Sequence, residues 1–202
     1  MKIIFWGTPK YAVQSLNIIF ESEHTILAVI TQPDKKRGRG NTLYSSPVKT
    51  RALELGIKVF SPTNIKNDIN ILSQLQELNP DIYIVVAFGQ ILPEAILEQP
   101  IYGSWNAHAS LLPKWRGAAP IQRSILNGDS KTGVTIMYME KGLDTGPILL
   151  KEEVPIKKSD NYNSIADKLS NLSSKLILKS IPIIKTGGKK TKEERLKNLS
   201  VK

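Results

Sequence analysis

Residues 82–89 read IYIVVAFG, an apolar run that ends at a phenylalanine and a glycine. The run has the length of a β-strand, and the side chains that would point to either face of the strand are apolar. A strand has this character when helices cover both faces of its sheet, as they do in parallel sheets. The stretch therefore predicts a buried strand of a parallel sheet.

On both sides of this stretch, apolar runs of strand length alternate with segments of helical period. Pro9, Pro47 and Pro93 support the helix starts, because proline in a first turn loses no hydrogen bond. This order predicts an α/β chain with a doubly wound, mostly parallel, Rossmann-like sheet. The expected strands are KIIFWG, TILAVITQ, KVFS and IYIVVAFG, and the helices that follow them span residues 9–20, 47–55, 69–78 and 93–97.

The second half of the chain continues with fewer helices. The pattern predicts a helix over residues 117–126, a strand GVTIMYM, a loop over 141–146, a strand that reaches Val154 and a helix over about 162–178.

Length and composition indicate an ordinary globular protein of one substantial domain. The chain has 202 residues, of which 41% are hydrophobic and 23% charged, and no segment has the length and apolarity of a membrane span. The start, MKIIFWGTPKYA, is better explained as a first strand than as a signal peptide. The chain has no cysteine, which excludes disulfides and thiolate chemistry and fits a cytoplasmic location. No obligate protein partner is evident.

The net charge of +10 is concentrated in two segments. Residues 34–41, DKKRGRGN, hold four cations among glycines and predict a flexible loop. Residues 185–202 carry seven basic and two acidic side chains and predict a disordered or loosely helical tail after a domain of residues 1–184. The charge serves either solubility or a polyanionic partner such as RNA.

The expected site lies beyond the carboxyl ends of the strands, where open sheets of this kind bind ligands. Gly7, the Phe88-Gly89 pair, Asn106, His108 and Asp144 all fall at or after predicted strand ends. The first turn, GTPKYA, lacks the glycine spacing of a dinucleotide site, and the chain has no phosphate-binding Gly-Lys-Ser/Thr loop. This argues against nicotinamide and nucleoside-triphosphate cofactors.

Asn106 and His108 have the i, i+2 spacing that places both side chains on one face of a strand. An amide donor beside an imidazole suits a reaction in which a carbonyl oxygen becomes negative and a proton moves. An aspartate near the imidazole, such as Asp144, would hold its tautomer. His108 and Asp144 are too few ligands for a metal, so no metal is expected. The alternative is a structural histidine whose hydrogen bonds a buried asparagine satisfies.

The stretch from residue 106 to 149, NAHASLLPKWRGAAPIQRSILNGDSKTGVTIMYMEKGLDTGPIL, closely resembles the signature region of methionyl-tRNA formyltransferases. FWGTPKYAVQSL, SSPVK and VVAFGQILP also match in family order, and the resemblance covers about residues 1–184. It implies formyl transfer from 10-formyltetrahydrofolate, without a metal, to the α-amine of initiator methionyl-tRNA. It also implies that Asn106 and His108 donate to the formyl oxygen, and that Asp144 holds His108 and a water that relays the amine proton.

The same resemblance assigns two binding surfaces. It implies folate contacts from the segments FGQILP and SLLP, at Phe88, Gly89, Gln90, Ile91, Leu92, Ser110, Leu111, Leu112 and Pro113. It implies tRNA contacts from the basic loop, at Lys35, Lys36, Arg37 and Arg39.

The chain departs from the family pattern at three positions and at its end. Trp6, Trp105 and Ala107 differ in size from the residues expected there and could crowd the site. The family normally continues into a C-terminal β-barrel that contributes to tRNA binding, which this chain is expected to lack. One alternative function is therefore a weak or inactive remnant that keeps folate or RNA binding. A second is formyl transfer to a small amine such as glycinamide ribonucleotide, against which the missing phosphate loop counts.

Overall fold

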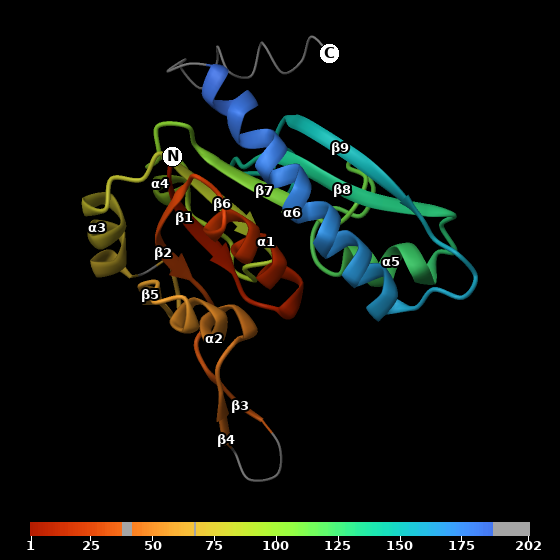
Figure 1. Ribbon diagram of the computed structural model, residues 1–202, viewed down its shortest axis with the longest axis horizontal. Helices are drawn as coiled ribbons and strands as arrows, with labels where there is room; N and C mark the ends of the chain where they lie inside the picture. The colour runs from red at the N-terminus through yellow and green to blue at the C-terminus, as the bar shows by residue number, and fades with distance from the viewer. Residues whose placement is uncertain (38–41, 67, 188–202) are drawn as a thin grey trace.

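A seven-stranded sheet forms the centre of the molecule, whose computed structural model describes residues 1–37, 42–66 and 68–187 (Figure 1). Its strands span Lys2–Gly7 (β1), Thr25–Ile30 (β2), Val59–Phe60 (β5), Ile82–Val86 (β6), Ser104–His108 (β7), Lys131–Tyr138 (β8) and Ile148–Pro155 (β9). They lie in the order β5-β2-β1-β6-β7-β8-β9. The five strands from β5 to β7 are mutually parallel, which confirms the mostly parallel sheet expected from the sequence.

β8 runs against this direction and β9 returns to it, which the sequence pattern did not indicate. β8 is antiparallel to β7, and β9 is antiparallel to β8. Only residues 139–147 connect β8 to β9. A parallel crossover needs about a dozen residues or more, so this connection allows only an antiparallel pair.

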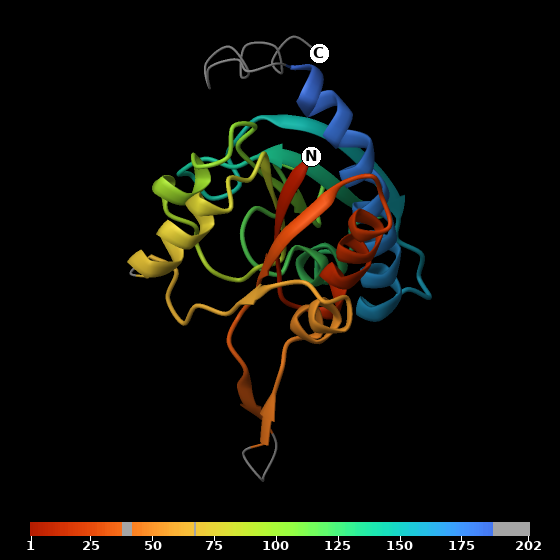
Figure 2. The same ribbon diagram turned by 60° about the vertical axis from the view of Figure 1, so that its left-hand side comes forward.

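Helices cover both faces of the sheet, as a doubly wound fold requires (Figures 1 and 2). They span Lys10–Phe20 (α1), Pro47–Glu54 (α2), Ile69–Glu77 (α3), Glu94–Leu97 (α4), Pro120–Leu126 (α5) and Tyr162–Thr186 (α6). Apolar residues of α1, α2, α5 and α6 pack on one face, which we call the α6-side core, and those of α3 and α4 pack on the other, the α3-side core. The four helices expected before residue 100 are confirmed.

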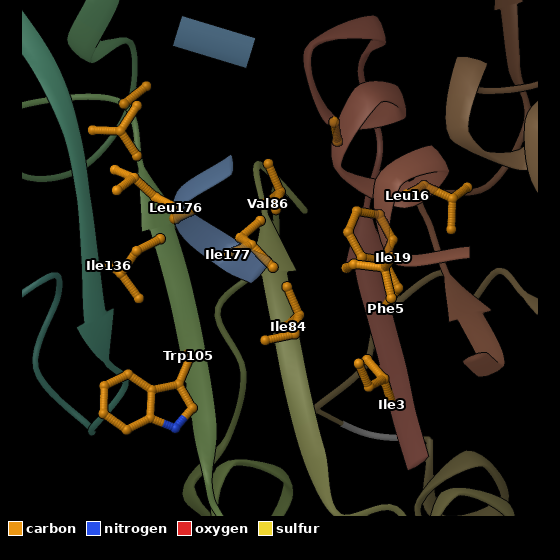
Figure 3. Close-up of a cluster of buried hydrophobic side chains, with 14 of the residues drawn as sticks. Ile3, Phe5, Leu16, Ile19, Ile84, Val86, Trp105, Ile136, Leu176 and Ile177 are labelled. Atoms are coloured by element: carbon orange, nitrogen blue, oxygen red, sulfur yellow. The ribbon is translucent and has the colours of Figure 1, made fainter. Parts of the chain in front are cut away.

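Alternation along β1 shows how one apolar strand serves both cores. Ile3 and Phe5 lie in the α6-side core, whereas Ile4 and Trp6 lie in the α3-side core, and all four are fully buried. In Figure 3, Leu176 and Ile177 of α6 lie against the same sheet face as Phe5, beside Ile84 and Ile136. Each such side chain contributes about 1.5–3 kcal/mol by leaving water.

Two helix boundaries differ from the expected ones. α5 begins at Pro120 and not at Gly117, because Gly117 and Ala119 adopt left-handed backbone angles, with φ of 83° and 60°. α6 passes the expected end at residue 178 and continues through Pro182 to Thr186. Burial of Ile181 and Ile184 in the α6-side core outweighs the backbone hydrogen bond that proline removes.

The expected domain boundary at 184 thus falls inside α6, and residues 188–202 lie outside the described part. No helix within the described ranges combines the length and apolarity needed to cross a membrane.

The segment expected to be a flexible loop, residues 34–41, contains a strand in its described part. Lys35–Arg37 (β3) pairs antiparallel with Thr42–Tyr44 (β4), in a separate two-stranded sheet. The expectation that residues 35–37 form no strand was wrong, and residues 38–41 lie outside the described part. The hairpin projects away from the body of the molecule (Figures 1 and 2).

Candidate active site

Polar side chains of β7 and of the β8–β9 loop meet on the α3-side face of the sheet. Trp105 and Ala107 of β7 lie in the α6-side core, so alternation turns Asn106 and His108 to the opposite face. Asn106 Nδ2 donates to Asp144 Oδ1 at 3.3 Å, and His108 Nδ1 lies 3.6 Å from Asp144 Oδ2. The structure therefore brings together the three residues expected to be catalytic.

Asp144 reaches this cluster by a route that differs from the expected one. Because β8 is antiparallel to β7, Tyr138 at the end of β8 pairs with Trp105 near the start of β7. The loop after β8 thus begins at the amino end of β7, and Asp144 extends back to Asn106. The site combines the carboxyl end of a parallel strand with a loop that leaves from the other end.

Both ring nitrogens of His108 face oxygen atoms. Nε2 lies 2.9 Å from the carbonyl oxygen of Trp115, which can only accept a hydrogen bond, so the proton belongs on Nε2. The 3.6 Å between Nδ1 and Asp144 is too long for a direct hydrogen bond. The Nδ1 edge is therefore the one that remains for a reacting group. Only 7% of the His108 side chain and 12% of the Asp144 side chain are exposed.

The cluster is surrounded by backbone in unusual conformations. Trp115, Asp144 and Ala87 have φ angles of 58°, 50° and 49°, which residues other than glycine rarely adopt. Each such residue costs about 1–3 kcal/mol and persists only where its surroundings hold it. For Asp144, the backbone N–H of Gly117 donates to Oδ2 at 2.8 Å. Strain of this kind is typical of functional sites.

The backbone conformation and the surroundings of position 117 favour glycine there. Its φ of 83° is left-handed, and a Cβ atom there would lie 3.3 Å from Leu143, the residue before Asp144. A side chain at position 117 would thus press on the loop that carries Asp144.

The residues expected to contact folate divide between buried and exposed positions. Ile91 is 63% exposed, and Pro113 is also exposed, whereas Leu92 and Leu112 are buried. Leu111 is half-buried. Ser110 is fully buried, and its Oγ donates to the Lys114 carbonyl at 2.6 Å.

The side chains of the FGQ turn are engaged within the protein. The Phe88 ring packs edge-on against Trp6 at 5.2 Å between centroids. The Gln90 amide accepts from Ile65 N at 2.9 Å and donates to the Pro62 carbonyl at 3.1 Å. A ligand contact by this turn would therefore involve its backbone or the exposed Ile91. Gly89, with φ of 91°, allows the turn.

The large residues that depart from the family pattern do not fill the cluster. Trp105 lies on the α6-side face, where its Nε1 donates to the Tyr102 carbonyl at 2.8 Å. Trp6 is fully buried beneath the FGQ turn, between Tyr83 and Phe88. Ala107 is buried in the α6-side core. The expectation that these residues crowd the site is wrong for Trp105 and Ala107, because the pleat of β7 turns both of them to the α6-side face.

Of the cations expected to bind RNA, Lys35, Lys36 and Arg37 belong to β3 of the hairpin. Lys35 and Lys36 are exposed. The side chain of Arg37 and all of Arg39 lie outside the described part. At the hairpin's base, Lys49 Nζ pairs with Asp34 at 2.8 Å, and this hydrogen bond lowers the pKa of the Asp34 carboxyl.

The described residues hold no metal-binding group, and two surface depressions are lined by residues other than the cluster. Among the residues that the structure describes, no group of three or more histidine, cysteine, aspartate or glutamate side chains could hold a metal ion. Two surface depressions, of about 470 and 290 Å³, lie beside α3 and share Asp68 and Asn70. Neither is lined by a residue of the Asn106–His108–Asp144 cluster, so the candidate site is identified by its chemistry.

Sequence reasoning missed the groups that complete the cluster. These are the carbonyl of Trp115 and the N–H of Gly117, backbone groups that do not depend on a particular side chain. It also missed Thr135, which pairs with His108 across the β7–β8 ladder and bridges the SLLP turn, donating from Oγ1 to the Ser110 carbonyl at 2.7 Å and accepting from Leu112 N at 3.1 Å.

Comparisons with known proteins agree with this geometry. The model of the formyl transferase family matches residues 1–181. A methionyl-tRNA formyltransferase of Prochlorococcus marinus strain MIT 9515 is 55% identical over 197 residues, which are 98% of this chain and 60% of that protein. The methionyl-tRNA formyltransferase of Prochlorococcus marinus subsp. pastoris strain CCMP1986 is 59% identical over 181 residues, covering 90% of this chain and 55% of the relative. The chain thus spans about 60% of the length of the curated relatives it matches.

Among solved structures, the fold is similar to phosphoribosylglycinamide formyltransferase from Anaplasma phagocytophilum. The TM-score is 0.75 at 24% identity, over 96% of this chain and 91% of the other. At this identity the likeness concerns the fold alone.

Proposed function

The chain belongs to the formyl transferase family, and we propose that it transfers a formyl group from 10-formyltetrahydrofolate to the α-amine of initiator methionyl-tRNA. The observation that supports this most strongly is the cluster of Asn106, His108 and Asp144, with the Nδ1 edge of the imidazole turned to the carboxylate. The names of relatives at 55–59% identity support the choice of acceptor.

The described residues fit a formyl donor with a flat ring system, whose faces apolar side chains can cover. 10-Formyltetrahydrofolate supplies a formyl carbon that an amine can attack. Two apolar residues are each 63% exposed: Ile91, which follows the FGQ turn, and Leu143, which precedes Asp144. Such side chains gain free energy when a ligand covers them. Asn106 provides the hydrogen-bond donor that a carbonyl oxygen needs.

In this mechanism each side chain of the cluster has a separate task. Asn106 has two amide hydrogens, so one can stay on Asp144 while the other donates to the oxygen that becomes negative. His108, with Nε2 bound to the Trp115 carbonyl, takes the proton of the attacking amine on Nδ1. Asp144 stabilises the positive charge that the imidazole then carries. His108 finally gives this proton to the nitrogen that the formyl group leaves.

The test of this function is a formylation assay with three acceptors: methionyl-tRNA, free methionine and glycinamide ribonucleotide. Formyl transfer to methionyl-tRNA above the other two supports the proposal. Transfer to glycinamide ribonucleotide alone would identify a small-amine enzyme. Binding of a folate analogue without transfer to any acceptor would identify an inactive remnant.

We propose that the β3–β4 hairpin binds tRNA through its cations. Replacing Lys35, Lys36, Arg37 and Arg39 by alanine is then expected to weaken tRNA binding and to flatten its salt dependence by up to about four units of log–log slope. The reason is that each cation that contacts a phosphate releases about one counterion. Titration of fluorescent tRNA at several salt concentrations measures both quantities.

A matched control replaces four exposed cations elsewhere, Lys157, Lys158, Lys175 and Lys179, which lie before and on α6. This variant loses the same net charge but keeps the hairpin. Equal losses of affinity in the two variants would show that net charge alone attracts RNA and would contradict the assignment. Affinity for a folate analogue should be unchanged in both.

A further inference from the structure

Asp129, between α5 and β8, is a carboxylate that the proposed mechanism does not use. Its side chain is 8% exposed, and three side chains donate to it. Trp115 Nε1 donates at 2.7 Å, Asn127 Nδ2 at 2.8 Å and Lys114 Nζ at 3.1 Å. The hydrogen bonds from Asn127 and from the Trp115 indole lower the pKa of the Asp129 carboxyl, so it remains charged at neutral pH.

Trp115 connects this carboxylate to the site. Its indole is held by Asp129, and its backbone carbonyl lies 2.9 Å from His108 Nε2. Its φ of 58° is costly for a bulky residue and requires contacts that hold it. On the other side of the loop, Gly117 N is bound to Asp144. The loop of residues 114–117 is thus fixed at one end by Asp129 and at the other by the catalytic cluster.

We propose that Asp129 is a positioning residue for His108. By holding the Trp115 indole, it keeps the Trp115 carbonyl on Nε2, which fixes the imidazole with the proton on Nε2 and with Nδ1 turned to Asp144. Without this anchor, the neutral ring can place its proton on either nitrogen, and the tautomer with the proton on Nδ1 cannot accept the amine proton there. Asp129 therefore determines which ring nitrogen acts.

The tautomer can be measured without any activity, because the chain has only two histidines. In a His24→Gln background, His108 is the only imidazole, and its ¹⁵N chemical shifts report which nitrogen carries the proton. At about pH 9, above the usual histidine pKa, the parent should show a proton on Nε2 only. Trp115→Phe deletes the indole N–H and keeps a ring, and Asp129→Asn removes the charge. Both are expected to show at least about a tenth of the ring with the proton on Nδ1.

Trp105→Phe is the matched control, since it deletes another indole N–H that is bound to a carbonyl, on the same strand as His108. It should keep the parent ¹⁵N pattern. A parent-like pattern in Trp115→Phe would overturn the proposal, and so would an equal change in Trp105→Phe. Amide spectra of each variant show that it is folded, and if Asp129→Asn does not fold, Trp115→Phe decides alone.

The kinetic consequence rests on the proposed function. Trp115→Phe and Asp129→Asn should lower kcat for formyl transfer by about 10- to 100-fold with little change in the KM for the acceptor, as misplacement of a catalytic group does. If the parent is inactive but the ¹⁵N pattern changes as expected, the proposed function fails and the positioning role stands. If the parent is active and the pattern does not change, the positioning role fails and the function stands.

Discussion

Asp144→Asn is expected to lower the rate of formyl transfer by about 10²- to 10⁴-fold while the chain remains folded. The substitution keeps the shape of the side chain, so it can still accept from Gly117 N through its carbonyl oxygen. It removes the negative charge 3.6 Å from His108 Nδ1, and with it the stabilisation of the imidazolium that the reaction forms. Single-turnover formylation of methionyl-tRNA measures the chemical step directly.

Asp81→Asn is the control for the loss of one carboxylate. Asp81 accepts from Lys2 N at 2.7 Å at the amino end of β1, the opposite edge of the parallel strands from His108. It should keep the parent rate. A rate within a few-fold of the parent for Asp144→Asn would show that the carboxylate has no part in the reaction.

His108→Ala is expected to cause a loss of similar size, about 10²- to 10⁴-fold, because it removes the group that accepts and returns the amine proton. It leaves a cavity beside the Trp115 carbonyl, into which free imidazole can diffuse. Partial recovery of activity with added imidazole, measured against its concentration, would identify the lost function as proton transfer. A purely structural histidine would show no such recovery.

His24→Ala is the matched variant, since His24 is the other histidine of the chain and lies 3.4 Å from the terminal amine at the far end of β1. It should leave formyl transfer unchanged. Should both variants lose activity to the same extent, the loss would reflect stability and the role of His108 would be contradicted.

The sequence allowed prediction of those parts of the fold and site that depend on side-chain pattern. The run IYIVVAFG predicted β6 because burial on both faces requires apolar residues in both rows. The spacing of Asn106 and His108 predicted their shared face, because strand side chains alternate. The antiparallel direction of β8 was not predictable in this way, since an apolar strand has the same pattern in either direction.

Groups that belong to the backbone were also beyond prediction. The roles of the Trp115 carbonyl and the Gly117 N–H depend on the position of the loop, and that position cannot be predicted from the residue types. Asp129 was missed because its role appears only through its contact with the Trp115 indole. At Pro182, tertiary burial outweighed a local preference against helix, and the extension of α6 could not be read from propensity alone.

The packing of α6 on α1 also bears on how the chain folds during synthesis. Residues of α1, among the first that the ribosome makes, contact α6, and Ser170 Oγ donates to the Tyr11 carbonyl at 2.7 Å across 159 positions of sequence. Tyr11 likewise contacts Ser173, at 2.8 Å between hydroxyl oxygens. Contacts so distant in sequence form slowly, and apolar surface that stays exposed meanwhile attracts chaperones or other nascent chains. We therefore expect the α6-side core to close only after α6 has left the ribosome exit tunnel.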